Sequence, residues 1–212
     1  MDPVTKQLNT IESAVFRKLR PLGFTCHRST LHRFVSGDIS QVIHFQCGPA
    51  RRNSVPLLSV NIGIRVPECA ERRFFPVNDK AYYHEYECNI RSRLGILSSK
   101  SAEGEKAFPL DGDREAICRD IWAEIEETVL PAFEILSNRQ AILAYREEYP
   151  WFDIVGSHMA QLEAAMIYGH LGNRQKAKEL FDAYYETALH NPESHPGHIS
   201  YLDTLRTQIG LS

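Results

Sequence analysis

The segment that most constrains the fold is residues 58–66, which read L-S-V-N-I-G-I-R-V. Its apolar residues occupy every second position, and small or polar residues lie between them. Successive side chains of a β-strand point to opposite faces of a sheet, so this alternation is typical of a strand with one buried face. Residues 39–47 (I-S-Q-V-I-H-F-Q-C) show a similar pattern, and Gly37-Asp38 before them suits a turn. We therefore predict an antiparallel sheet around these two strands.

Two further strands, over residues 24–35 and 81–97, would complete a four-stranded sheet. A helix is predicted over residues 5–20, where Ile11, Val15 and Leu19 form an apolar stripe. Helical patterns return over residues 113–148, with an interruption at Pro131. We expect these helices to cover one face of the sheet.

The last part of the chain has helical composition throughout. Apolar and small residues recur at helical spacing in residues 157–171 and 175–189, and Gly172-Asn173 separates them as a turn. The predicted fold class is therefore α+β: an antiparallel four-stranded sheet packed by helices, followed by a C-terminal helical hairpin. We assign residues 1–150 to the sheet domain and residues 151–212 to the helical extension.

Composition narrows the class of protein. The chain has 212 residues, of which 43 % are hydrophobic, so it can bury a hydrophobic core without support from disulfides or a structural metal. A formal net charge of −3 gives no basic field for nucleic acid. We find neither a run of about 18 apolar residues nor a secretory signal at the start. Five scattered cysteines without a C-x-x-C pair predict reduced thiols and a cytoplasmic location.

No pattern of standard catalytic machinery is present. The sequence has no G-x-S-x-G elbow, no G-x-G-x-x-G and no phosphate-binding loop. His84 and Cys88 are four residues apart, but zinc needs three or four converging ligands and no spacing matches a known set. We predict no catalytic residue, no metal and no cofactor.

Aromatic and arginine side chains cluster instead in one region of the chain. Such residues anchor protein interfaces. The hypothesis is a non-enzymatic protein that acts through protein–protein interaction. The candidate partner-binding residues are Arg72, Arg73, Phe74, Phe75, Tyr82, Tyr83 and Tyr86.

Two alternatives stay open. A small-ligand-binding protein or enzyme would use a polar cleft on the sheet face, where His44 and Gln46 alternate with the core positions. Its candidate ligand-binding residues are Arg33, His44, Gln46 and Asn61. Nucleic-acid binding, which we do not expect, would need Arg28, Arg33, Arg51 and Arg52 on one surface. A homodimer is a further open alternative, and no membrane association is expected.

The order of short motifs in the first 150 residues resembles the bacterial family known as domain of unknown function DUF4304. These motifs are L-G-F at 22–24, Arg33, F-Q at 45–46, N-I-G at 61–63, E-C-N-I-R-S-R-L-G at 87–95 and Trp122. The resemblance implies an α+β sheet domain and no established activity. By analogy with compact α+β proteins of this size and charge, one concrete version of the interaction role is neutralisation of a toxin, as by an immunity protein.

Residues 158–189 are similar to a single tetratricopeptide-type helical hairpin. Ala165, Tyr168, Gly172, Ala177 and Phe181 stand at its small, aromatic, turn, small and aromatic positions. Tyr184 departs from the pattern, because a small residue is expected there. One repeat cannot bury its own apolar face, so the hairpin is expected to pack on the sheet domain or on a partner.

Overall fold

The computed structural model describes residues 3–48, 55–70, 81–99, 101–148, 160–191 and 196–211. The chain divides into two compact units, residues 1–66 with 78–155 and residues 67–77 with 156–212. The first unit contains the sheet and the helices that cover it. The second unit is helical in its described residues.

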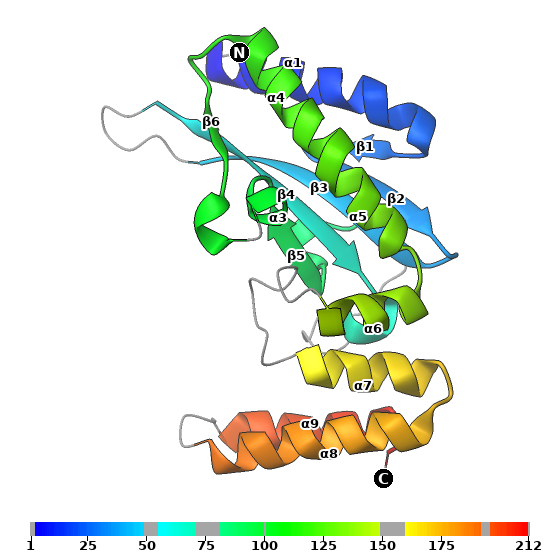
Figure 1. Ribbon diagram of the computed structural model, residues 1–212. Helices are drawn as coiled ribbons and strands as arrows, with labels where there is room; N and C mark the ends of the chain where they lie inside the picture. The colour runs from blue at the N-terminus through cyan, green and yellow to red at the C-terminus, as the bar shows by residue number, and fades with distance from the viewer. Residues whose placement is uncertain are drawn as a thin grey trace. The chain divides into compact units, whose positions relative to one another are not determined.

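The first unit is built on a six-stranded antiparallel sheet of order β1-β2-β3-β4-β5, in which β6 also pairs with β4 (Figure 1). The strands are β1 (Thr25–His27), β2 (Thr30–Val35), β3 (Ile39–Cys47), β4 (Leu57–Arg65), β5 (Ile90–Arg93) and β6 (Ala107–Pro109). β5 pairs with residues 61–64 of β4 and β6 with residues 57–59, so together they cover the edge of β4 that β3 leaves free.

The α+β class is confirmed, but the prediction of four strands is wrong. A two-residue turn at Arg28-Ser29 divides the first predicted strand into the β1–β2 hairpin. Residues 81–97 are not one strand: they contain the 3₁₀ turn η3 (Glu85–Glu87), β5 and the short helix α3 (Ile96–Ser99). Residues 98–112, for which no element is predicted, contain η4 (Ala102–Gly104) and supply β6. Short strands of three or four residues carry too little periodicity to be recognised in a sequence.

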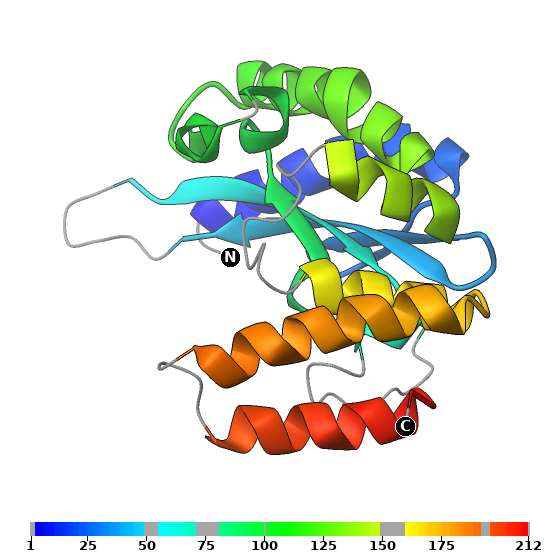
Figure 2. The same cartoon turned by 60° about the horizontal axis from the view of Figure 1, so that its bottom comes forward.

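One face of the sheet forms the core, as the alternation predicts. Apolar side chains of β3 and β4 that share this face are almost completely buried: Ile39, Ile43, Phe45, Leu58, Val60, Ile62 and Ile64. The helices α1 (Pro3–Leu19) and α4 (Arg114–Glu124) lie side by side over this face (Figure 2). They contribute buried residues at helical spacing, including Ile11, Val15, Leu19, Ile117 and Ile121.

The helix after α4 does not break at Pro131. It passes through one π turn, η5 (Ile125–Val129), directly into α5 (Leu130–Ile135). A π turn shifts the backbone hydrogen bonds by one residue, which helps a helix to accommodate a proline that lacks an N–H. The helix ends before Ser137-Asn138, and α6 (Arg139–Glu148) follows, with Asn138 Oδ1 accepting from the Ala141 N–H at 2.9 Å. A short 3₁₀ helix, η1 (Arg20–Leu22), ends α1.

The second unit contains α2 (Pro67–Ala70), α7 (Ala160–His170), α8 (Arg174–His190) and α9 (Pro196–Gln208). α7 and α8 form the predicted helical hairpin, in which Asn173 Oδ1 caps α8 at the Lys176 N–H. Apolar, fully buried side chains of α7, α8 and α9 form the core of the second unit: Leu162, Ala165, Ile167, Ala177, Phe181, Leu202 and Leu205. The similarity to a tetratricopeptide-type repeat stays a prediction.

Candidate functional site

The second face of the sheet, opposite α1 and α4, carries polar and aromatic side chains. Strand pairing places on this face the residues that alternate with the core positions: Thr25, His27, Thr30, His32, Phe34, Ser40, Val42, His44, Gln46, Ser59, Asn61, Gly63, Arg65, Arg91 and Arg93. Three histidines therefore lie on one face of the β1–β2–β3 part of the sheet. We call this surface the open face.

The segment 81–88 lies against the open face. Gly63 makes the approach possible, because a Cβ there would come within 2.6 Å of Cys88 Sγ. His32 Nε2 donates to the Ala81 carbonyl oxygen at 2.6 Å, which fixes the beginning of the segment. Within the segment, the His84 N–H donates to Glu87 Oε2 at 2.9 Å, and this bond closes the 3₁₀ turn.

A row of four rings forms where this segment meets the β1 edge. The His27 ring stacks on Tyr82 with a centroid distance of 3.7 Å, Tyr82 meets His84 edge to face at 5.3 Å, and His84 stacks on Tyr86 at 5.0 Å. Tyr86 is 53 % exposed, and the other three side chains are half-buried. We call these four residues the His–Tyr surface.

Tyr83 lies between Tyr82 and Tyr86 in the sequence, but its side chain is buried and does not join their row of rings. The Arg65 guanidinium lies over its ring at 3.8 Å from the centroid, and Phe34 meets it edge to face at 6.1 Å. A cation over an aromatic face in a buried place contributes about 1–2 kcal/mol. Tyr83 therefore anchors the segment, while Tyr86 and Phe34, which is 44 % exposed, reach the surface.

The acidic side chains of this region are engaged in the fold. Glu85 and Glu87 are both more than nine-tenths buried. Glu85 Oε1 accepts from Arg91 Nε in a partly buried ion pair, and Glu87 caps the 3₁₀ turn. Removing one partner of a buried pair leaves an uncompensated charge, so this pair holds the segment to β5.

The structure places three of the seven predicted partner-binding residues, and their role stays a prediction. Tyr82 and Tyr86 lie together in the His–Tyr surface, whereas Tyr83 is buried beneath Arg65. The remaining four, Arg72, Arg73, Phe74 and Phe75, lie outside the described residues.

Three of the four predicted ligand-binding residues come together on the open face. His44 and Asn61 are directly opposite in the β3–β4 register, and Asn61 Nδ2 donates to Gln46 Oε1 at 2.8 Å. His44 Nδ1 lies 3.0 Å from Thr30 Oγ1. Polar atoms of these residues are thus already paired within the sheet.

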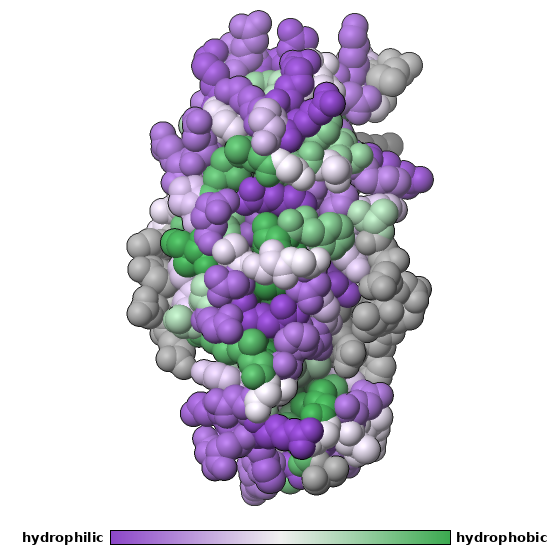
Figure 3. Space-filling model, turned by 90° about the vertical axis from the view of Figure 1, so that its right-hand side faces the viewer, coloured by the Kyte–Doolittle hydropathy of each residue, from purple (hydrophilic) through white to green (hydrophobic). Residues whose placement is uncertain are grey.

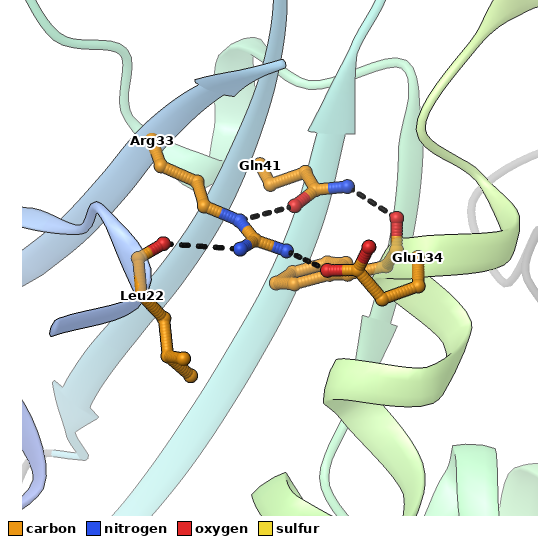
Figure 4. Close-up of polar contacts among 5 residues, drawn as sticks. Leu22, Arg33, Gln41 and Glu134 are labelled. Carbon is orange, nitrogen blue, oxygen red and sulfur yellow. Dashed lines mark hydrogen bonds and ion pairs between the residues drawn. The ribbon is translucent and has the colours of Figure 1, made fainter. Parts of the chain in front are cut away.

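Arg33 is on the opposite, helix-covered face, so it does not join the other three. Its guanidinium bonds to Gln41 Oε1, to the Leu22 carbonyl oxygen and to Glu134, and Gln41 in turn donates to the Phe133 carbonyl oxygen (Figure 4). Arg33 therefore ties β2 to α5. Arg33 is therefore also unavailable for the predicted nucleic-acid surface. Of the other three arginines of that surface, Arg28 is exposed at the β1–β2 turn, and Arg51 and Arg52 lie outside the described residues.

Thiol and metal chemistry find little support in the described part of the chain. Burial and the nearby Glu12 carboxylate raise the pKa of the Cys26 thiol, and burial raises the pKa of Cys118. A raised pKa keeps a thiol protonated and weakly nucleophilic. In the described residues, no group of three His, Cys, Asp or Glu side chains is arranged to hold a metal ion.

Acid should destabilise the open face. Burial lowers the pKa of both His32 and His44, so the folded protein favours their neutral forms. The unfolded chain binds these protons near pH 6.5, and stability is therefore lost as the pH falls below about 6.5. Burial raises the pKa of Glu12, which acts in the opposite direction because the folded state then binds a proton more readily.

A double variant, His32→Gln with His44→Gln, separates these effects because it keeps Glu12. At pH 7.5 we expect the free energy of unfolding to fall by about 1–2 kcal/mol, since hydrogen bonds of the two rings are replaced imperfectly. Between pH 7.5 and 5.5 the wild type should lose more stability than the variant, as measured by urea unfolding. Equal losses in the two proteins would contradict the assignment.

His27, Arg28, His32 and Arg33 form a cationic row within residues 24–35, and the sequence alone does not place them on one face of the sheet. The face of each of these side chains follows from the division of the segment into two short strands, because the hairpin turn brings His27 opposite Thr30 and beside His32. The alternation of Tyr82, His84 and Tyr86 was a usable signal, since their rings form one row.

These features define a class: an α+β domain whose sheet is covered by helices on one face and carries a polar face with surface-exposed rings on the other. A family model described as domain of unknown function (DUF4304) matches residues 15–135, more than half of the chain. The chain belongs to this family. No curated protein and no solved structure matches it significantly. Among the described residues, none of the helices is long and apolar enough to cross a membrane.

Proposed function

We propose that this protein acts by binding another protein, without catalysing a reaction, and that the His–Tyr surface is part of its binding site. The observation that carries the proposal is the row of four rings, contributed by segments far apart in the sequence and reaching the surface at Tyr86. Tyrosine gives a large, stiff contact area with a polar tip, and aromatic residues are enriched among the anchors of protein interfaces.

The distribution of apolar side chains on the rest of the surface also favours the His–Tyr surface as the binding site. On the side of the molecule that Figure 3 shows, apolar side chains of the described residues form small patches among hydrophilic ones. Exposed aliphatic residues elsewhere include Leu22 and Ile135, at 43 % and 52 %. Scattered aliphatic side chains are ordinary on a protein surface, whereas a stacked row of rings is a patterned feature.

Neutralisation of a bacterial toxin in the cytoplasm, as by an immunity protein, is the specific form that we favour. Such a protein needs a stable scaffold and one exposed binding surface, and it needs no catalytic group. None of the five cysteines, all of which lie in the described residues, forms a disulfide, which is consistent with a reducing compartment. The raised pKa values of the Cys26 and Cys118 thiols also argue against nucleophilic catalysis by those residues.

The test is capture of a partner from native cells, followed by affinity measurement with the purified partner. Tyr86→Ala should weaken binding at least about tenfold, or about 1.4 kcal/mol, because it removes an interface anchor. Ile135→Ala is the matched control, since Ile135 is 52 % exposed but lies on α5, and it should leave the affinity unchanged.

The outcomes separate the candidate functions. A partner that arrests growth when produced alone and is silenced by co-production would support toxin neutralisation. Equal effects of Tyr86→Ala and Ile135→Ala would contradict the proposed surface. A particle that contains this chain alone, as a monomer or a homodimer, would favour a small polar ligand at His44, Gln46 and Asn61.

A further inference from the structure

Arg28 occupies a backbone position that suits glycine. It is the first residue of the two-residue turn between β1 and β2, and its φ is +52°. A residue with a Cβ is sterically strained in this left-handed conformation, which glycine adopts without a steric cost. An arginine at such a position is therefore a local cost to the fold.

In the described part of the chain, no hydrogen bond, ion pair or ring contact of the Arg28 side chain compensates this cost. The Arg28 side chain is exposed, and no acidic side chain there pairs with it. The backbone carbonyl of Arg28 does accept from Cys26 Sγ, but any residue would supply that carbonyl. Strain retained at an exposed residue points to a use for its side chain outside the folded chain.

Arg28 lies at the end of the His–Tyr surface. It directly follows His27, whose ring stacks on Tyr82. His27 and His32 lie on the same face of the hairpin. His32 is buried and its Nε2 already donates to the Ala81 carbonyl oxygen. This end of the open face therefore offers the Arg28 guanidinium and the half-buried His27 ring, which can donate hydrogen bonds to carboxylates.

The acidic side chains near Arg28 do not neutralise its positive charge at the surface. Glu85 and Glu87 are buried and bonded to Arg91 and to the His84 N–H. Glu12 hydrogen-bonds Ser29 from α1, on the helix-covered side, and its side chain is buried, so it is not presented to solvent. Among the described residues, the groups that this end of the open face presents to solvent are thus the Arg28 cation and the half-buried His27 ring.

We propose that the partner segment that docks on the His–Tyr surface is acidic, with carboxylates that bind Arg28 and the adjacent His27 ring. This inference rests on the proposed function and specifies the chemistry of its partner. Charge complementarity of this kind mainly sets the association rate and specificity, so the affinity should fall as salt rises.

The experiment uses the full-length protein and a displayed library of random dodecapeptides, followed by anisotropy measurements with the selected peptides. We expect acidic peptides, whose affinity drops about tenfold in Arg28→Gln, as for loss of one charge-assisted contact. Arg119→Gln is the charge-matched control, because Arg119 is exposed on α4, and it should have no effect.

Arg28→Gly should change the melting temperature and the peptide affinity in opposite directions. It should raise the melting temperature by about 2–4 °C, because it removes the left-handed strain in a chain of this size, yet it should weaken peptide binding as Arg28→Gln does. A destabilised variant that binds poorly would not distinguish folding from recognition, and this variant avoids that problem.

The remaining outcomes distinguish the two proposals. Peptides that need Tyr86 but are neutral or basic, and bind Arg28→Gln normally, would overturn the acidic partner and leave the proposed function intact. Peptides whose binding depends on neither Arg28 nor Tyr86 would overturn both. A single-stranded oligonucleotide that binds more tightly than any peptide would also overturn both.

Discussion

Replacing Gly95 by alanine should destabilise the first unit by about 3–5 kcal/mol, the sum of a conformational cost and a steric one. Gly95 has a φ of +86°, where a residue with a Cβ is strained. A Cβ at this position would also overlap the Gly104 carbonyl oxygen and come within 2.7 Å of the Lys106 backbone nitrogen. Both neighbours are backbone atoms, which cannot move aside as the end of a side chain can.

The crowding at Gly95 follows from its place in the fold. The Leu94 N–H donates to the Val60 carbonyl oxygen on β4, and the Leu94 carbonyl oxygen accepts from the Lys106 N–H. The end of β5 and the start of β6 are therefore held together at this point. A shift of the backbone there would disturb the pairing of both strands with β4. Urea unfolding followed by circular dichroism measures the loss.

Gly23→Ala is the matched control. Gly23 has a φ of +87°, but nothing lies within 4 Å of the Cβ that alanine would add. Its expected cost is the conformational part alone, about 1–2 kcal/mol. If Gly95→Ala cost no more than Gly23→Ala, the close approach of residues 95, 104 and 106 would be disproved.

Replacing Gln41 by leucine should cost about 3 kcal/mol, although leucine has a similar size and the site is in the core. Gln41 is fully buried between β3 and α5. Its amide donates to the Phe133 carbonyl oxygen, and its Oε1 accepts from Arg33 Nε at 2.7 Å (Figure 4). Leucine would leave a buried carbonyl and a mostly buried guanidinium N–H without partners, each costing about 1–3 kcal/mol.

Gln46→Leu is the control on the same strand. Gln46 is exposed on the opposite face and accepts one bond, from Asn61. Its loss should cost about 1 kcal/mol. A second variant, Gln41→Glu, keeps the acceptor for Arg33 but removes the donor to Phe133, so it should also destabilise. Stability equal to the wild type in both Gln41 variants would show that the Arg33–Gln41–Phe133 connection does not hold α5 on the sheet.

The sequence by itself determined the long regular elements. The alternation in residues 39–47 and 58–66 predicted β3 and β4, because one buried face imposes a period of two on side chains. The apolar stripes of residues 5–20 and 113–129 predicted α1 and α4 for the corresponding helical reason. The order of short motifs was enough to indicate the DUF4304 family, which the family match over residues 15–135 confirms.

Only the tertiary structure decided which polar residues meet. Arg33 and His44 are both strand residues with polar side chains, yet one lies under the helices with Gln41 and the other on the open face, because strand register fixes the face of each side chain. The His–Tyr surface depends on a turn at Arg28-Ser29 and on the close approach that Gly63 allows. Contacts between segments far apart in the chain leave no periodic trace in the sequence, so the candidate site emerged only when the sheet was assembled.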